Sequence, residues 1–267
     1  MKDFNDRIVV VTGASSGIGR AIAVELASHG ATAVLVGTNL QRLEESRKLC
    51  EDIGATAHVQ QADVADAAAM QTMANTVINE IGVPDVLVNN AGVVMSGLIH
   101  EVEPEEWQRL IGINIMGVVH GCRYFLPAML QRGRGGHIVN MASAAGLIGQ
   151  PGMSTYCATK HAVVGMSASM RYELSGQGIG VTTICPGYVQ TPILNNLKLV
   201  GKLDTGKVRD KVASDMKRNK LTAEDVARRT AKAIRQNEAF VTIGRDARAA
   251  YLGKRFAPGI MDRMFSR

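Results

Sequence analysis

A tyrosine and a lysine stand four positions apart, Tyr156 and Lys160, in the segment STYCATKHAVVG at 154–165. Four positions make about one helical turn, so in a helix the two side chains lie on the same face. A phenol with a pKa of about 10 is a poor proton donor near neutral pH. An ammonium about 4 Å away, at an effective dielectric near 20, stabilises the ionised phenol by roughly 4 kcal/mol, about three pK units. The pair is therefore either a tuned proton donor or two solvated neighbours on a helix surface.

A glycine-rich stretch, TGASSGIG at 12–19, separates an apolar run from an amphipathic one. Between a strand and a helix, Gly13 permits a tight turn, Gly17 lets the backbone approach a ligand, and Gly19 lets helix and strand pack closely. The free N–H groups at the start of the helix would bind a pyrophosphate, unless the turn is purely structural. The loop's candidate cofactor residues are Gly13, Ser15, Ser16, Gly17, Ile18 and Gly19.

Strand and helix patterns alternate along the chain and must position these residues. Strands are expected at 7–12, 32–37, 56–61, 85–92, 136–143, 180–187 and 239–244, with helices between them. No hairpin signal separates the strands, which predicts an α/β fold with a doubly wound, Rossmann-like parallel sheet in three layers, as a single domain over 1–245. Ligands of such sheets bind beyond the carboxyl ends of the strands. Residues 190–225 lack sheet periodicity and are expected to form an insert over the substrate site.

The end of the second expected strand bears on the choice of dinucleotide. An acid at this point accepts from the ribose hydroxyls of NAD, but the sequence here reads Gly37, Thr38, Asn39. The absence of a carboxylate removes repulsion toward the 2′-phosphate of NADP. Ser15, Thr38 and Asn39 would supply neutral hydrogen bonds, with Arg42 as a more distant cation. We therefore expect NADP(H) in preference to NAD(H).

Two further segments follow expected strands. Asp63 would accept from an adenine amino group with Val64 beside the ring, or it would cap the next helix. The small residues of NNAG at 89–92, namely Asn90, Ala91 and Gly92, stand where a ribose and a nicotinamide must be approached by backbone.

Taken together and in this order, the motifs resemble the short-chain dehydrogenase/reductase family, in its single-domain branch. The matching pieces are TGASSGIG, Asp63-Val64, NNAG, Asn114, Ser143, YCATK at 156–160 and PGYVQT at 186–191, and they cover about residues 5–245. The resemblance implies a nicotinamide cofactor, hydride transfer and a homo-dimer or homo-tetramer.

Four residues would carry the catalysis that the resemblance implies. Tyr156 would act as general acid and base, and Lys160 would tune it and hold ribose hydroxyls. Ser143 would donate to the substrate oxygen, and Asn114 would hold a water that links Lys160 to solvent. The structural alternatives are a strand-end cap for Ser143 and a helix kink for Asn114.

The resemblance also assigns the nicotinamide and substrate walls. Pro186, Gly187, Val189 and Thr191 would flank the nicotinamide and a phosphate. The substrate residues would be Ser143, Ala145, Met153 and Tyr188. Because this lining carries little charge, an apolar ketone or secondary alcohol is the expected substrate.

Composition excludes several other classes of protein. The chain of 267 residues is 46% hydrophobic, and no apolar run approaches the roughly 20 residues that span a bilayer. The start does not resemble a secretion signal, and the four scattered cysteines suit the reducing cytoplasm. No metal-ligand spacing is present. The basic excess lies from Gly201 onward, with 17 Lys and Arg against 8 Asp and Glu, and it lacks the aromatic strand or recognition helix of a nucleic-acid binder.

Two other functions and a C-terminal segment stay open. The chain would alternatively reduce a 3-ketoacyl thioester on CoA or an acidic carrier protein, which would dock at Arg132, Arg134 or the basic C-terminal region. A non-catalytic nucleotide sensor would lack some member of the catalytic set, all of which is present. Residues 246–267 form a basic amphipathic extension that would cover a neighbouring subunit, rest on an acidic membrane surface or pack on its own domain.

Overall fold

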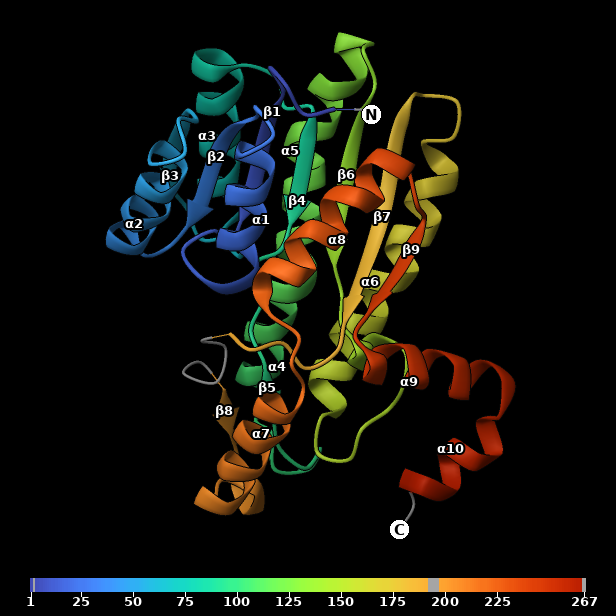
Figure 1. Ribbon diagram of the computed structural model, residues 1–267. Coiled ribbons are helices and arrows are strands. Elements are labelled where there is room, and N and C mark those ends of the chain that lie inside the picture. The colour runs from blue at the N-terminus through green and yellow to red at the C-terminus, as the bar shows by residue number, and fades with distance from the viewer. Residues whose placement is uncertain (2, 192–196, 266–267) are drawn as a thin grey trace.

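Seven parallel strands form the central sheet in the order β3-β2-β1-β4-β6-β7-β9 (Figure 1). The computed structural model describes residues 1, 3–191 and 197–265. The strands are β1 Ile8–Thr12, β2 Thr32–Gly37, β3 Ala57–Gln61, β4 Val86–Asn89, β6 Gly136–Met141, β7 Ile179–Pro186 and β9 Phe240–Ile243. Each lies within a range that the sequence pattern predicts, except that β7 begins one residue earlier, at Ile179, so the doubly wound α/β fold is confirmed.

Successive residues of the strands pack into opposite layers of the core. Val9 and Val11 of β1 belong to the cluster that covers α1, α2 and α8, whereas Val10 belongs to the cluster on the other face, with α3 and α5. All three valines are fully buried. A parallel sheet covered on both faces requires apolar side chains on both, which explains the uninterrupted run IVVVT.

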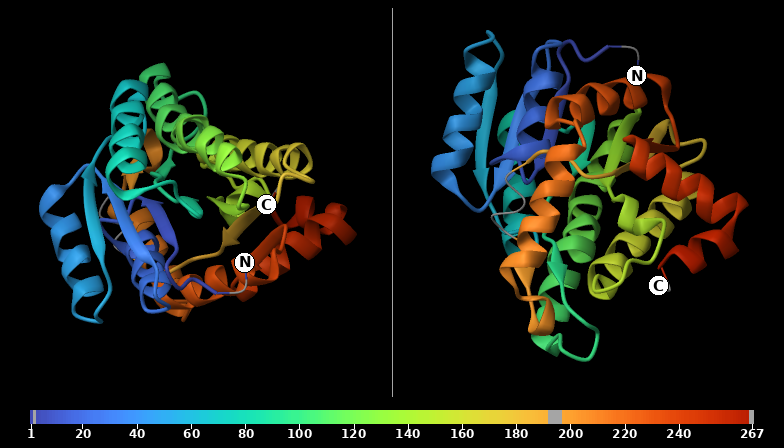
Figure 2. Two further views of the ribbon diagram at one scale, coloured as in Figure 1. Left: turned by 90° about the horizontal axis from the view of Figure 1, so that it is seen from above. Right: turned by 60° about the horizontal axis from the view of Figure 1, so that its bottom comes forward.

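Helices cover both faces of the sheet (Figure 2). Helix α1 packs against α8 on one face, and α3 packs against α5 on the other. The helices up to β7 are α1 Gly17–Ala27, α2 Leu40–Glu51, α3 Ala67–Thr76, α4 Pro104–Ile111, α5 Gly117–Arg132 and α6 Ser154–Glu173. Those after β7 are α7 Gly206–Arg218, α8 Ala223–Gln236, α9 Arg245–Phe256 and α10 Pro258–Phe265. Among the described residues, none of these helices is long and apolar enough to cross a membrane.

The segment expected as an insert, 190–225, contains regular structure. A short strand β8, Lys198–Leu199, pairs in parallel with β5, Met95–Ser96, outside the main sheet. A 3₁₀ turn at Gly201–Leu203 and helix α7 follow. The Thr205 side chain caps α7 by accepting a hydrogen bond from the Val208 N–H. Residues 192–196, which belong to the same expected insert, lie outside the described residues.

The C-terminal segment begins at the carboxyl edge of the sheet (Figures 1 and 2). Helix α9 packs on β9 and on the turn Ala144–Gly146, with Ala247 and Ala250 buried. Helix α10 packs on α9, and Phe256 and Ile260 are 74% and 69% exposed around the corner between them. Packing on its own domain, one of the three expectations for this segment, therefore holds for α9.

Candidate active site

The glycine-rich loop joins β1 to α1 as the motif predicts. Gly13 and Gly17 have φ angles of +67° and +54°, a backbone conformation that residues with a Cβ rarely adopt. A Cβ on Gly19 would lie 2.3 Å from the Gly13 carbonyl oxygen, so helix and loop touch through backbone. Ser16 stands at the N-cap of α1 without a side-chain capping bond. The first N–H groups of α1 thus lack a side-chain cap, as an anion site at a helix start requires.

Thr12 ties this loop to the NNAG segment after β4. Its Oγ1 accepts hydrogen bonds from the backbone N–H groups of Asn90 and Ala91, both at 3.0 Å. The Asn90 side chain in turn donates to the Thr12 carbonyl oxygen at 2.9 Å. Thr12 is 1% exposed, so the joint is buried. We did not assign Thr12 a role from the sequence, because its partners lie 78 and 79 positions away.

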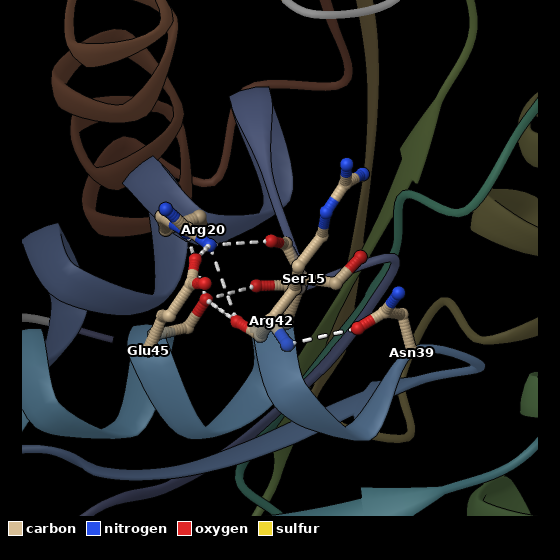
Figure 3. A network of polar contacts seen from close by, with 7 residues as sticks. Ser15, Arg20, Asn39, Arg42 and Glu45 are labelled. Atoms are coloured by element: carbon tan, nitrogen blue, oxygen red, sulfur yellow. Dashed lines mark hydrogen bonds and ion pairs between the residues drawn. The ribbon is translucent and has the colours of Figure 1, made fainter. Parts of the chain in front are cut away.

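A polar network holds the end of β2 beside the glycine loop (Figure 3). Arg20 donates to the Ser15 carbonyl oxygen at 2.7 Å and pairs with Glu45 at 3.0 Å. Asn39 accepts from the Arg42 N–H at 2.9 Å and so caps α2. The Arg42 guanidinium extends away from the Arg20–Glu45 pair and has no hydrogen bond or ion pair with another described residue. Of the predicted neutral contacts, Asn39 is therefore partly committed to its helix, while Arg42 presents a cation.

Asp63 is exposed after β3, and the cap of the next helix comes from another residue. Asp66 accepts from the N–H groups of Ala68 and Ala69 at the start of α3. Asp63 accepts from the Ala65 N–H and keeps its other oxygen outside that turn. Val64 is buried. The capping alternative for Asp63 is thus wrong, and its carboxylate is accessible to a ligand.

Asn114 lies within a π-helical turn, Gly112–Met116, that interrupts the helical run from α4 to α5. Its Oδ1 accepts from the Val93 N–H at 2.9 Å, and its Nδ2 donates to the Val93 carbonyl oxygen at 3.0 Å and to Thr159 Oγ1 at 3.1 Å. Thr159 donates to the Tyr156 carbonyl oxygen at 2.8 Å. The predicted kink is present, and it places Asn114 between the NNAG loop and α6. Thr159 is a second buried connector to which sequence reasoning assigned no role.

Gly92 brings the loop after β4 against the catalytic helix. A Cβ on Gly92 would lie 3.2 Å from Asn114 Oδ1 and 3.3 Å from Lys160 Nζ. Lys160 is 4% exposed, and its Nζ donates to the Met141 carbonyl oxygen at 2.9 Å. Burial lowers the pKa of Lys160 to about 8. The lysine is therefore buried where the loop at Gly92 and the end of β6 meet helix α6.

Tyr156 is half-buried beside Ser143 and Lys160. Burial raises the pKa of its phenol to about 12, and a hydrogen bond with the Ser143 side chain opposes that rise. Lys160 Nζ lies 5.8 Å from the centre of the Tyr156 ring, over its face, and is hydrogen-bonded to Met141. In the protein alone, burial thus outweighs the lysine charge. The tuning of the phenol that we expect from Lys160 therefore requires the added positive charge of an oxidised nicotinamide, and it stays a prediction.

Ser143 and the apolar surroundings of Tyr156 define the substrate side. Ser143 Oγ accepts from the Ala145 N–H at 3.2 Å, so it caps the turn Ala144–Gly146, as the structural alternative predicts, and also reaches Tyr156. Ala145 is 4% exposed. Tyr156 packs with an apolar cluster that sequence reasoning did not include: Val93, Met95, Val102, Trp107, Leu110 and Val200.

The loop after β7 carries the predicted nicotinamide residues. Gly187 donates to the Ile243 carbonyl oxygen at 2.8 Å, and Val189 is buried. Thr191 donates to the Val189 carbonyl oxygen at 3.4 Å. Tyr188 is 38% exposed at the loop surface. Met153, the remaining predicted substrate residue, is half-buried at the start of α6.

A cleft of about 690 Å³ opens between α4 and β8, next to Val93. Its lining mixes both charges: Val93, Glu106, Arg109, Leu197, Lys198, Leu199, Asp204 and Arg209. Glu106 pairs with Lys198 at 2.5 Å and with Arg109 at 3.1 Å. These pairs lower the pKa of Glu106 and leave little net charge on the wall.

Arg132 does not fit the docking role that the acyl-carrier alternative gives it. Its guanidinium pairs with Asp85 at 3.2 Å and donates to the carbonyl oxygens of Val83 and Gly135. Its side chain is 10% exposed. Arg132 therefore fixes the end of α5, and Arg134 is left as the exposed cation of that pair.

The chain is similar to known proteins in both sequence and structure. The family model described as short chain dehydrogenase matches residues 7–199. An uncharacterized oxidoreductase of Staphylococcus epidermidis is 39% identical over 193 residues, 72% of this chain and 82% of that protein. The 3-oxoacyl-[acyl-carrier-protein] reductase FabG of Thermotoga maritima is 32% identical over 191 residues, 72% of this chain and 77% of that protein.

A longer relative and two solved structures extend the comparison. The probable oxidoreductase EphD of Mycobacterium tuberculosis is 40% identical over 191 residues, 72% of this chain, and the chain spans about a third (32%) of its length. A short-chain dehydrogenase/reductase of Burkholderia phymatum, solved in complex with NAD, superposes with a TM-score of 0.86 at 30% identity over 99% of this chain and 97% of that chain. Levodione reductase superposes with a TM-score of 0.82 at 28% identity over 92% of this chain and 98% of that chain.

Proposed function

Because the chain belongs to the short-chain dehydrogenase family, whose members are oxidoreductases, we propose that it transfers a hydride between a nicotinamide dinucleotide and an apolar ketone or secondary alcohol. One observation carries the proposal. Gly92 lies against both Asn114 and Lys160, so the loop after β4 meets the helix that carries Tyr156. The NNAG loop and the helix that carries the proposed proton donor therefore lie against each other at the end of β4.

The residues at the carboxyl edge fit a dinucleotide. Gly13 and Gly19 are positions where a Cβ would collide with backbone or Asn90, so glycine there lets the loop, the start of α1 and the NNAG segment pack closely, as in a dinucleotide-binding turn. The start of α1 would hold the pyrophosphate, and the free oxygen of Asp63 would accept from the adenine amino group. When bound, the dinucleotide gives or takes the hydride.

Tyr156, Ser143 and Lys160 would handle the proton. The Tyr156 hydroxyl would donate a proton to the carbonyl oxygen in reduction and accept it in oxidation, while Ser143 fixes the direction of that oxygen. Burial keeps the Tyr156 phenol protonated in the protein alone, so in this state the residue is ready to donate a proton, as reduction of a carbonyl requires. Oxidation needs the additional positive charge of an oxidised nicotinamide beside Lys160, which lowers the cost of ionising Tyr156.

Proton supply to this group would run through Lys160 and Asn114. The Asn114 amide is occupied by Val93 and Thr159. A π-helical turn leaves a main-chain carbonyl without its usual helical partner. We therefore assign the water that links Lys160 to solvent to this main-chain carbonyl or to the remaining lone pair of Asn114 Oδ1.

The decisive experiment compares wild type with Tyr156→Phe. Purified enzyme receives NADPH or NADH with a panel of apolar ketones, and nicotinamide absorbance is followed. We expect turnover in wild type and a loss of at least about 10²-fold in the variant, with dinucleotide affinity within about twofold, because the hydroxyl moves a proton and leaves the adenosine side untouched. Undiminished turnover in Tyr156→Phe means that another group is the acid.

NADP(H) is the dinucleotide that the end of β2 favours. No acid occupies 37–39, and the Arg42 guanidinium has no partner among the described residues. We expect Arg42→Ala to weaken NADPH binding by about tenfold and NADH binding by less than about twofold, since a single phosphate–arginine pair is lost. Arg47→Ala is the matched control, because Arg47 on the same helix pairs with Glu44 and Glu51. A wild-type preference for NADH would overturn this assignment.

An apolar substrate follows from the walls of the site. Tyr156 packs on the apolar cluster of Met95, Val102 and Leu110. In the neighbouring cleft, Glu106 is paired with Lys198 and Arg109. The relative FabG, a reductase of 3-oxoacyl groups on acyl carrier protein, supports the alternative of a ketoacyl thioester substrate. That alternative predicts turnover of acyl thioesters that falls steeply with salt, whereas an apolar ketone predicts little salt dependence.

The oligomeric state and the cellular compartment are proposed from the family and from the free thiols. We propose a homo-dimer or homo-tetramer. All four cysteines are unpaired thiols, which suits a reducing cytoplasm. An acidic membrane surface stays a prediction for the basic C-terminal helices, and no nucleic-acid partner is proposed.

A further inference from the structure

The first turn of α9 reaches back to the loop after β7. Asp246 Oδ2 accepts a hydrogen bond from the Tyr188 backbone N–H at 2.8 Å. Tyr188 follows Pro186 and Gly187, which end β7 and begin the proposed nicotinamide wall. A residue beyond the matched family segment, 58 positions after its partner, therefore touches the active-site loop.

Gly187 packs directly on the same carboxylate. A Cβ on Gly187 would lie 2.0 and 2.1 Å from the two carboxylate oxygens of Asp246 and 2.2 Å from its Cγ. The backbone of Gly187 is outside the positive-φ region, so its conformation does not require glycine. The space taken by Asp246 requires it instead.

Asp246 is not used to cap its own helix. Gly244 holds the N-cap position of α9, and no side-chain capping bond is present there. The carboxylate is instead turned against Gly187 and Tyr188, and its Oδ1 is buried without a hydrogen-bond partner among the described residues. A buried, unpaired carboxylate oxygen costs stability. Because this arrangement of Asp246 lowers stability, its contact with the loop explains it better than a contribution to the stability of α9.

Helix α9 also supports the other wall of the site. It packs against the turn Ala144–Gly146, which directly follows Ser143. Gly187 is further tied to β9 through the Ile243 carbonyl oxygen. One helix therefore contacts both loops that border the reacting atoms in the proposed function.

We propose that Asp246 is a positioning residue that holds the Gly187-Tyr188 peptide in the place where this loop binds the nicotinamide half of the dinucleotide. The inference rests on the proposed function. It assigns Asp246 to orientation of the loop, so it predicts a change in nicotinamide binding with no change in binding of the adenosine half.

The first test measures binding of NADPH and of 2′,5′-ADP by calorimetry. We expect Asp246→Ala to weaken NADPH by about tenfold and to leave 2′,5′-ADP within about twofold, because the adenosine half contacts other loops. Asp246→Asn should restore most of the NADPH affinity, since its amide oxygen still accepts from the Tyr188 N–H. Asp225→Ala is the control, because Asp225 completes the capping box of α8 and should change stability alone.

The second test is a double-mutant cycle. Gly187→Ala forces the carboxylate away and should weaken NADPH in wild type, whereas in the Asp246→Ala background the added methyl has room and should cost markedly less. Additive effects, or equal losses for NADPH and 2′,5′-ADP in Asp246→Ala, would overturn the inference. If wild type binds neither ligand, the proposed function itself fails. If wild type binds both and Asp246→Ala binds them equally well, the inference alone fails.

Discussion

At the scale of single residues, burial sets the protonation of the site. It raises the pKa of Tyr156 to about 12 and lowers that of Lys160 to about 8. Both shifts favour the neutral form, since a low-dielectric surrounding penalises either charge. In the protein alone, Tyr156 is therefore protonated across the physiological range and Lys160 begins to lose its proton near pH 8. In the proposed function, activation of the phenol would then depend on the positive charge of an oxidised nicotinamide.

A buried histidine outside the site predicts acid sensitivity of the fold. Burial lowers the pKa of His137 to about 3, and its Nε2 donates to Thr182 Oγ1 at 2.7 Å, because that hydroxyl itself donates to the Glu238 carbonyl oxygen. The folded state keeps His137 neutral, while the unfolded chain binds a proton below about pH 6.5. Stability should therefore fall as pH decreases from about 6.5 toward 3, by up to about 1.4 kcal/mol per pH unit from this group.

Urea unfolding at several pH values measures this dependence. His137→Gln keeps a donor but cannot titrate, so its stability should decline less steeply than wild type between about pH 6.5 and 4.5. The exposed His100→Gln serves as control and should match wild type. Equal slopes in all three proteins would show that His137 does not carry the effect.

At the scale of elements, buried hydroxyls connect the strand ends. Thr12 accepts two backbone N–H groups of the NNAG segment. Thr12→Val keeps the shape but leaves both donors unpaired, at a cost of about 1–3 kcal/mol each. We expect a lower free energy of unfolding, by about 2 kcal/mol or more, and weaker dinucleotide binding, because the β1 and β4 loops separate. Chemical denaturation and calorimetry check both effects, and Thr12→Ser, which keeps the hydroxyl, should stay close to wild type.

The strands and the main motifs were predictable because they depend on local pattern. The sheet strands other than β3 (AHVQQ) follow from apolar runs, and the resemblance to the family places Asn114 and Lys160 in one site, where both lie beside Gly92. The roles of Thr12, Thr159 and Asp246 were not predictable, since each depends on a hydrogen bond to a residue that only the folded chain brings near. The effect of burial on Tyr156 was missed for the same reason: sequence spacing gives the neighbour but not the surrounding dielectric.

At the scale of the whole molecule, the basic C-terminal segment divides into two parts. Helix α9 belongs to the body through Ala247, Ala250 and Asp246. Helix α10 packs on α9 and adjoins the exposed Phe256 and Ile260. Two large apolar side chains are thus exposed at one corner, and we expect them to form part of a surface for association.

Truncation after Phe256 separates these parts. Removal of 257–267 spares Asp246, so we expect unchanged turnover and a smaller oligomer by light scattering, because an exposed apolar corner loses its neighbouring helix. Sedimentation with anionic vesicles, run in parallel, tests the membrane surface. An unchanged mass together with unchanged vesicle binding would rule out both roles for α10.

The order of the strands has a consequence for how the enzyme is made. β1 pairs with β4 across more than seventy intervening residues, and Asn90 must reach Thr12 before the phosphate loop is braced. Helix α6, which carries Tyr156 and Lys160, and the loop at Gly187 come later still, and the carboxylate of Asp246 that contacts that loop comes last. A chain arrested before α9 would hold all the proposed catalytic residues but not the carboxylate that supports the Gly187 loop. We expect such a chain to bind the nicotinamide half of the dinucleotide more weakly than the finished protein, even when its sheet has assembled.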